Sequence, residues 1–311
     1  HFTVDAVTKI IEYSSRLTGD RNKLSTRFNE LLELIFEANA WSEDTQYVEF
    51  DDVVTAIEEK EYRDNLAEEK VQEMIEKDHI LIDTEGEKVG QINGLAVYQT
   101  GQYAFGRPTK ITARTFVGQS GLVNIEREVD MSGKIHNKGV MILSGFLGGK
   151  YAQDKPLSLS ASLTFEQNYG GVDGDSASCA ELISLLSSLS KIDIDQQLAI
   201  TGSLNQKGEV QPIGGVNQKI EGFYKTCKQK GLTGEQGVVI PYQNVDNLML
   251  KQEVMDAVDS GDFNIYAIKE IDEAIEIMMA EPAGQVHQKV QEKLENFADK
   301  AEQAGNDDQV E

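Results

Sequence analysis

A serine and a lysine stand in sequence settings that could support nucleophilic chemistry. Ser176 lies in Gly171-Val-Asp-Gly-Asp-Ser-Ala-Ser178, and 43 residues later Lys219 ends the segment Gln211-Pro-Ile-Gly-Gly-Val-Asn-Gln-Lys219. A serine hydroxyl is a poor nucleophile at neutral pH and needs a neighbouring base. Lysine can be that base only when neutral, so its pKa must fall from about 10.4 by about three units, which costs roughly 4 kcal/mol. Because burial is the usual way to lower a lysine pKa, we expect apolar surroundings for Lys219.

The residues around Lys219 predict a helix that could bury it. Val216, Ile220, Phe223 and Cys227 recur at spacings of four, three and four, which is the pattern of an amphipathic helix. Lys219 borders this apolar stripe in the first turns of the helix. A lysine in such a place more often extends to water, so this segment alone does not establish a catalytic role.

A second helix is predicted directly after Ser176. Apolar residues follow it at helical spacing, namely Cys179, Leu182, Ile183, Leu186 and Leu189. Ser176 and Ala177 would then lie at a helix N-terminus, where free backbone amides can stabilise an oxyanion. The alternative is an aspartate or serine that only caps the helix.

The two motifs, taken together with their separation, resemble the proteolytic domain of Lon proteases. The Asp-Gly-Asp-Ser-Ala-Ser form is similar to the B-type, archaeal-like branch of that family. The resemblance implies a serine–lysine dyad in which Ser176 is the nucleophile and Lys219 is the base. It also implies that Thr201 lies beside the dyad and hydrogen-bonds the lysine.

Asp173 and Asp175 are the other candidate supporting residues. A carboxylate beside Lys219 would raise the lysine pKa and oppose its role as a base, and either aspartate could instead cap the helix. One hypothesis is a resting state in which Asp173 pairs with Lys219.

The first part of the chain predicts a small helical domain. Apolar residues recur at helical spacing over residues 1–65, and strand patterns are nearly absent there. This region resembles the helical lid of AAA+ ATPases, which precedes the protease domain in Lon. The resemblance implies that Arg27 reaches the phosphates of a nucleotide, although an arginine on a helix is more often simply solvated.

The remaining residues predict a mixed α/β (α+β) domain of the Lon proteolytic type. A charged helical connector, 66–79, leads to strand patterns at 92–98, 110–117, 157–165 and 238–240, with a helix at 133–149 and a hairpin around 206–208. We place the proteolytic domain at 80–282. Residues 283–311 are predicted to form a C-terminal helix with a solvated acidic tail.

Substrate-binding residues are expected next to the serine loop. The family resemblance places an edge strand near Phe165, Gln167 and Tyr169, against which a peptide could add as a further strand. Phe116 is a second candidate for a substrate pocket.

Composition excludes several partners. The chain has 311 residues and a formal net charge of −24, which argues against nucleic acid or an anionic membrane as a partner. It contains no apolar run of about 18 residues that could span a membrane.

Its four histidines and two cysteines show no metal-ligand spacing, so we predict no metal site. No signal peptide opens the chain, and both cysteines fall on helical apolar stripes, which favours a cytoplasmic location.

No complete phosphate-loop motif occurs, so no ATPase active site is predicted within these residues. The chain is interpreted as a C-terminal fragment, with ATP and magnesium implied for a missing upstream ATPase part. A membrane anchor in that missing part stays possible.

The sequence therefore favours a serine endopeptidase. The resemblance implies that it degrades unfolded or damaged polypeptides in protein quality control, with ATP-dependent proteolysis by a homo-hexamer in the intact protein. Two alternatives stay open. One is a non-proteolytic Lon-like ring scaffold, and the other is a small-molecule serine–lysine amidase.

Overall fold

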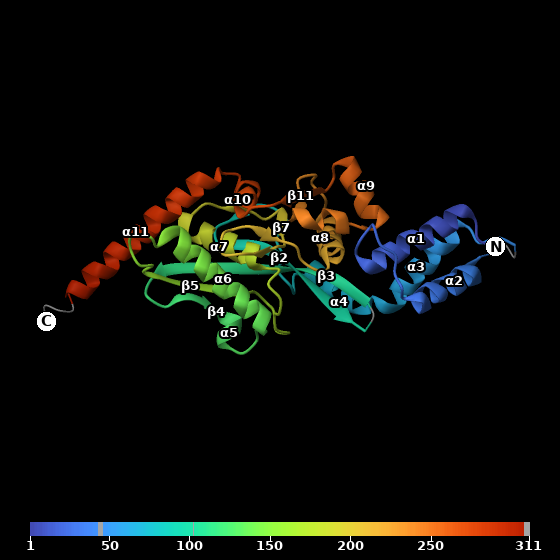
Figure 1. The fold of residues 1–311 in the computed structure, drawn as a ribbon, viewed down its shortest axis with the longest axis horizontal. Helices are drawn as coiled ribbons and strands as arrows, with labels where there is room; N and C mark the ends of the chain where they lie inside the picture. The colour runs from blue at the N-terminus through green and yellow to red at the C-terminus, as the bar shows by residue number, and fades with distance from the viewer. Residues whose placement is uncertain (43–45, 102, 308–311) are drawn as a thin grey trace.

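The computed structural model describes residues 1–42, 46–101 and 103–307, with side chains up to residue 303. The molecule is elongated, and its N-terminal helices and its C-terminal helix lie at opposite ends (Figure 1). The first helices are α1 (Val4–Thr18), α2 (Phe28–Trp41), α3 (Phe50–Asp64) and α4 (Leu66–Glu76).

Helices α1, α2 and α3 pack into a small core of their own. Thr3 caps α1, where its side chain accepts a hydrogen bond from the backbone amide of Ala6, and Gly19 ends the helix in the left-handed conformation. Ala6, Leu34 and Val53, one from each helix, are buried together. These helices confirm the predicted all-helical region, and the sheet described next confirms the mixed α/β fold that follows it.

A seven-stranded mixed sheet forms the centre of the rest of the molecule. Its order is β11 (Asn264–Ile268), β10 (Gly237–Pro241), β7 (Leu198–Ile200), β2 (Gln91–Thr100), β3 (Tyr103–Val117), β5 (Leu159–Phe165) and β4 (Gly121–Asn124). The β2–β3 and β3–β5 pairs are antiparallel, and the other neighbours are parallel.

The remaining elements surround this sheet. Two short ladders join β1 (Glu87–Lys88) to β6 (Ile194–Asp195) and β8 (Ser203–Leu204) to β9 (Val210–Gln211). The other helices are α5 (Ile125–Glu128), α6 (Lys134–Tyr151), α7 (Ser178–Ser190), α8 (Val216–Lys230), η1 (Tyr242–Asn247), α9 (Gln252–Ser260), α10 (Ile271–Met279) and α11 (Ala283–Asp307).

Alternation along the strands places α7 and α8 on opposite faces of the sheet. In β7, Ile200 belongs to the core that contains α7, whereas Ala199 belongs to the core that contains α8. In β10, Val239 and Val238 divide in the same way. Successive strand residues point to opposite faces, so the helix after Ser176 and the helix that carries Lys219 approach the sheet from its two sides.

Helix α8 lies against β3 with almost no space between the two backbones. A Cβ atom built on Gly106 of β3 would lie 1.9 Å from the backbone oxygen of Gln218, and one built on Gly222 would lie 2.2 Å from the backbone oxygen of Gly106. Only glycine fits at such an approach. This contact therefore fixes how closely the first turns of α8 approach the sheet.

The structure corrects the prediction of an edge strand at residues 165–169. Strand β5 lies between β3 and β4, and the chain turns directly after Phe165. The edges of the sheet are β11 and β4. The prediction came from the family resemblance and from no local pattern, and the four-residue strand β4 pairs with β5 on the side that was expected to be free.

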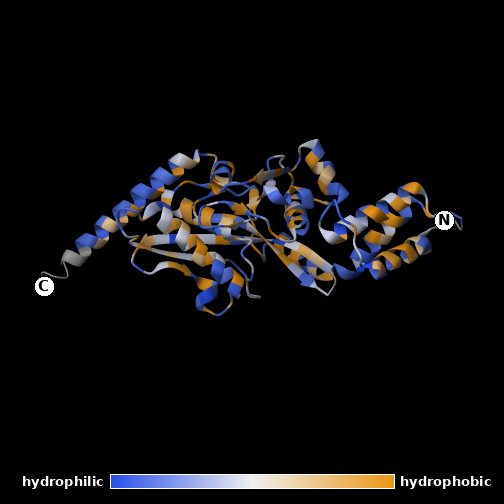
Figure 2. Ribbon diagram, in the orientation of Figure 1, coloured by the Kyte–Doolittle hydropathy of each residue, from blue (hydrophilic) through white to orange (hydrophobic). Residues whose placement is uncertain are grey.

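Helix α11 packs on the body of the molecule over its first half. Val286, Val290, Leu294 and Phe297 are buried against the core that contains α7, and Figure 2 shows hydrophilic residues along most of the helix. The predicted acidic tail lies largely outside the described side chains.

A Gly106→Ala variant should lose stability because the added methyl group cannot avoid the backbone of α8. We expect the free energy of unfolding to fall by about 3 kcal/mol. Gly149→Ala, at an exposed helical position with open space around it, is the matched control and should raise stability by about 0.5–1 kcal/mol. Denaturant unfolding of both variants measures the difference, and equal stabilities would contradict the described packing.

Candidate active site

Ser176 lies in the loop that leads into α7. In space this loop lies beside the C-terminal end of strand β7. Gly171 and Gly174 have φ values of 82° and 90°, so the loop turns through conformations that favour glycine. The carbonyl oxygen of Ser176 accepts hydrogen bonds from the amide of Gly202, at 2.9 Å, and from the hydroxyl of Thr201, at 3.1 Å. The serine loop is therefore tied to the residues that directly follow β7.

Lys219 reaches the same place from the first turn of α8. Gly215, with φ of 67°, precedes this helix, and its carbonyl accepts the Lys219 amide. The lysine is 3% exposed. Its Nζ lies 2.9 Å from Ser176 Oγ and 3.0 Å from Thr201 Oγ1. The structure thus brings together the three side chains that the sequence analysis associated with the dyad.

Burial makes Lys219 a much stronger candidate base than an ordinary lysine. Removal of water from the ammonium lowers its pKa from 10.5 to about 8, and the negative charge of Asp175 opposes this shift to a smaller extent. Asp175 Oδ2 accepts a hydrogen bond from Ser203 Oγ, at 2.9 Å, which holds the carboxylate to β8. Asp175 therefore lies near the lysine without forming a direct ion pair with it.

Thr201 orients the lysine. Its hydroxyl has one proton, which it donates to the carbonyl of Ser176, so the same oxygen must accept from Lys219 Nζ. One N–H of the lysine is thereby fixed on Thr201. A neutral amine then has one further N–H and a lone pair, and rotation about the Cε–Nζ bond can turn the lone pair toward the hydroxyl of Ser176.

Backbone donors are available beside the serine. The amides of Ser176 and Ala177 donate no hydrogen bond to any residue in the described part of the chain. The neighbouring amides of Ser178 and Cys179 bind the carbonyls of Asp175 and Gly202. Two free donors therefore remain at the N-terminal end of α7, where an oxyanion could be held.

Asp173 does not form the resting ion pair with Lys219 that the sequence suggested. Its Oδ1 accepts hydrogen bonds from the backbone amides of Gly174, Ile135 and His136, at 2.8, 3.2 and 3.3 Å. These hydrogen bonds hold the pKa of Asp173 below its usual value. The carboxylate is committed to the first turn of α6, so its role here is to cap that helix.

A pocket of about 260 Å³ opens beside Ser176 and Lys219. Phe165, one of the predicted substrate-binding residues, lines it together with Thr109 and with residues 94–98 of β2. Strand β2 pairs with β7 only through Asn93 and Gly94, so among the described residues no strand pairs with 95–100 on that side. The free strand edge beside the serine thus belongs to β2. The sequence predicted a strand at residues 92–98 but did not indicate that a substrate could bind there.

Three predicted substrate residues lie elsewhere. The Gln167 side chain bonds the backbone of His79 and Leu81 and so holds the connector. Tyr169 is 86% exposed and lies on a neighbouring surface. Phe116 is seven residues beyond Thr109 on β3, about 23 Å along an extended strand, so it does not line this pocket.

Two comparisons with known protein families match separate parts of the chain. The model of the archaeal LonB AAA+ ATPase lid domain matches residues 1–63, and that of the Lon protease (S16) C-terminal proteolytic domain matches residues 167–281. The chain belongs to the Lon protease family. The second match includes Ser176, Thr201 and Lys219, and it supports a serine-type peptidase.

Relatives of known sequence agree with this assignment. A putative Lon protease homolog of Escherichia coli (strain K12) is 39% identical over 277 residues, which cover 88% of this chain and 47% of that protein. A second, from Haemophilus influenzae, is 35% identical over 94% of this chain and 49% of its own length. An archaeal Lon protease of Archaeoglobus fulgidus is 34% identical over 89% of this chain and 42% of its own length. The chain spans about half the length of the curated relatives it matches.

The Lon lid region carries Arg27 at the start of α2. Its side chain is mostly exposed, and its Nη1 lies 3.4 Å from Glu30 Oε1. A single exposed arginine is open to a phosphate, but it does not by itself form a nucleotide site. Within the described residues there is no group of three or more histidine, cysteine or acidic side chains that could hold a metal ion, and no helix is long and apolar enough to cross a membrane.

Proposed function

We propose that this Lon-family chain is a serine endopeptidase in which Ser176 and Lys219 form the catalytic dyad. One observation carries the proposal: a lysine that is 3% exposed has its Nζ 2.9 Å from a serine Oγ. Burial makes the charged ammonium costly, so this site favours the neutral amine. Beside a serine hydroxyl, the neutral amine is useful as a base.

The mechanism begins with proton transfer. Ser176 Oγ attacks the carbonyl carbon of the scissile peptide bond while its proton moves to the lone pair of Lys219. The amides of Ser176 and Ala177 stabilise the negative oxygen of the tetrahedral intermediate. The protonated Lys219 then gives its proton to the leaving amine, the C–N bond breaks, and an ester on Ser176 remains. Water, deprotonated by Lys219, hydrolyses this ester and frees the serine.

The lowered pKa has a large effect on the population of the reactive form. At pH 7 a lysine with a pKa of about 8 is neutral in about a tenth of molecules, whereas an ordinary lysine is neutral in about 0.03%. The difference is about 300-fold. Burial of Lys219 alone thus supplies a substantial share of the activation.

The substrate is proposed to be an extended polypeptide that adds to the free edge of β2 over residues 95–98. This edge borders the pocket that contains Ser176 and Lys219. Main-chain hydrogen bonds along such an edge give affinity without requiring a particular sequence, provided that the peptide is extended. Unfolded or damaged polypeptides meet this condition and folded proteins do not.

The proposal includes an ATP-driven homo-hexamer in the whole protein. It is supported by the match of residues 1–63 to a lid domain of AAA+ ATPases. ATP and magnesium would act in an ATPase part, and no step of peptide hydrolysis at Ser176 uses them.

Replacing either member of the dyad should abolish peptide hydrolysis. We expect Ser176→Ala and Lys219→Met to lower kcat/KM for a fluorogenic peptide by at least about 1,000-fold. Lys228→Met, at an exposed lysine of the same helix, is the matched control and should change it less than about two-fold. Retained hydrolysis in Lys219→Met would refute the dyad. Hydrolysis of small amides but not of peptides would indicate an amidase, and no hydrolysis by the unaltered chain at any concentration would indicate a scaffold.

The rate should rise with pH because only the neutral lysine can accept the proton of Ser176. We expect kcat/KM to increase about ten-fold for each pH unit well below pH 8 and to level off above it, since the pKa of Lys219 is about 8. Initial rates between pH 5.5 and pH 10, with enzyme stability checked at each pH, measure this profile. A flat profile from pH 6 to pH 9 would exclude Lys219 as the base.

Peptides with single N-methylated amides test the use of the β2 edge. Along a strand, only every second backbone N–H points toward a given neighbouring strand. Methylation of those amides should therefore raise KM by about ten-fold, at every second position near the scissile bond. The intervening positions should change little. An equal effect at all positions would show that the substrate does not bind as an added strand.

A further inference from the structure

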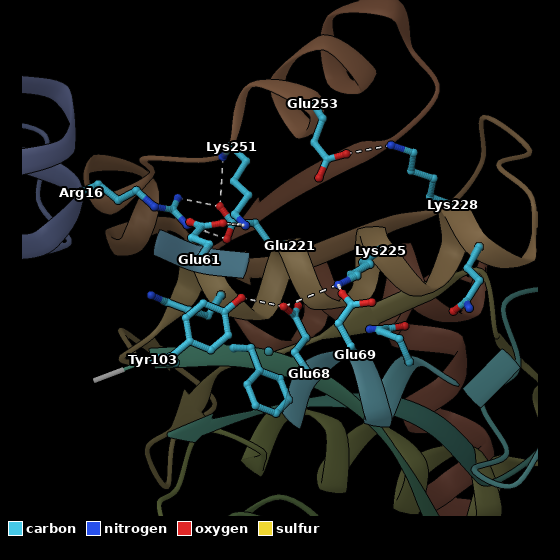
Figure 3. Close-up of a pocket in the computed structure, with 16 residues that line it drawn as sticks. Arg16, Glu61, Glu68, Glu69, Tyr103, Glu221, Lys225, Lys228, Lys251 and Glu253 are labelled. Carbon is cyan, nitrogen blue, oxygen red and sulfur yellow. Dashed lines mark hydrogen bonds and ion pairs between the residues drawn. The ribbon is translucent and has the colours of Figure 1, made fainter. Parts of the chain in front are cut away.

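An arginine of the lid reaches the helix that carries Lys219. Arg16, near the end of α1, forms a two-pronged ion pair with Glu221 of α8 (Figure 3), with Nη1–Oε1 at 2.7 Å and Nη2–Oε2 at 2.8 Å. Nη1 also donates to the carbonyl of Met249. The two side chains are 23% and 12% exposed, so the pair is largely shielded from water.

Glu221 is held by more than one partner. Its Oε1 also accepts the backbone amide of Lys251, at 3.0 Å, and the side chain of Lys251 pairs with Glu61 of α3. Burial disfavours the charged guanidinium, yet the hydrogen bonds and charge of Glu221 outweigh it and raise the pKa of Arg16. A guanidinium that forms two parallel hydrogen bonds to one carboxylate fixes the relative orientation of the two side chains as well as pairing their charges.

The position of Glu221 on α8 matters because of what lies on the other sides of the helix. Glu221 follows Lys219 by two residues, which places the two side chains about 200° apart around the helix. Glu221 therefore faces the lid while Lys219 faces Ser176. Around the helix, Gly222 lies between the directions of these two side chains, and it packs against the backbone of Gly106. A shift of α1 would act on this helix close to Lys219.

A second set of contacts supports the same helix further along. Lys225 Nζ lies 2.7 Å from Glu69 and 3.6 Å from Glu68 of α4, and Glu68 accepts a 2.6 Å hydrogen bond from the hydroxyl of Tyr103 at the start of β3 (Figure 3). The connector is thus fastened to both α8 and β3. The lid and the connector together hold α8 from the side opposite the serine.

We propose that Arg16 and Glu221 form a positioning clamp through which the lid sets the place of Lys219 relative to Ser176. The inference rests on the proposed dyad and adds that the lid controls the alignment of the dyad through Arg16 and Glu221. With the clamp closed, Nζ is held at hydrogen-bond distance from Ser176 Oγ. When the lid moves and the clamp opens, α8 loses its outer support and the dyad loses its alignment.

The direct test is a double-mutant cycle on peptide hydrolysis. Because a misplacement of about 1 Å can cost about 100-fold, we expect Arg16→Gln and Glu221→Gln each to lower kcat by 10- to 100-fold with KM changed less than two-fold. The double variant should be no more than about two-fold slower than the slower single variant, because both changes break one contact. Effects on kcat that multiply, or single variants as fast as the unaltered chain, would overturn the clamp.

Arg21→Gln is the matched control. Arg21 pairs with Asp246 of η1, so it also joins the lid to the proteolytic domain, but the pair is exposed, and within the described residues neither side chain has a hydrogen bond or ion pair to α8. Its removal should leave kcat within two-fold. If Arg21→Gln slows hydrolysis as much as Arg16→Gln, the contacts only hold the domains together and the clamp is wrong. Arg16→Lys, which keeps the charge without the fork, should fall between the unaltered chain and Arg16→Gln, and it remains informative if Arg16→Gln does not fold.

A measurement that needs no activity separates the clamp from the dyad. Hydrogen exchange at the amides of residues 216–222, followed by mass spectrometry, should become at least about ten-fold faster in Arg16→Gln and stay unchanged in Arg21→Gln. If peptide hydrolysis fails in the unaltered chain while this difference is present, the proposed function is wrong and the clamp still positions α8. If exchange is the same in all three proteins, the clamp is wrong whatever the activity.

Discussion

The burial of one amine against one hydroxyl is the constraint on which the rest of this structure depends. Lowering the pKa of Lys219 from 10.5 to about 8 corresponds to about 3 kcal/mol that disfavours the ammonium. The fold must supply that free energy through its other contacts. The serine loop tied to β7, the glycine contact between α8 and β3, and the lid that braces α8 all hold the amine where water cannot solvate it.

Two helices from opposite faces of the sheet meet at this point because β7 is short. The strand ends at Ile200, and Thr201 then bonds both the serine carbonyl and the lysine. On the side of β2 opposite β3, the same shortness leaves no strand paired beyond Gly94 in the described part of the chain. One feature of the sheet therefore creates the place where the dyad meets and the edge to which we propose a peptide adds.

Local patterns in the sequence predicted the helices after Ser176 and Gly215 and several strands, because each has a clear hydrophobic period. The first half of β3 was missed, since Gly106 and Pro108 interrupt the pattern. The structure explains both residues: glycine admits α8, and Pro108 lies where β3 pairs only with β2, the pairing to β5 beginning at Ile111. The ion pair of Arg16 with Glu221 joins residues 205 apart and leaves no local pattern.

The titration of Lys219 itself tests the central claim most directly. Lysine side chains labelled with ¹³C at Cε can be followed by NMR between pH 6 and pH 11, with the resonance of Lys219 assigned by its loss in Lys219→Met. The account predicts a midpoint near pH 8 for this resonance, while exposed lysines titrate above pH 10. A midpoint above pH 10 for Lys219 would show that the amine remains charged at neutral pH and would contradict its role as the base.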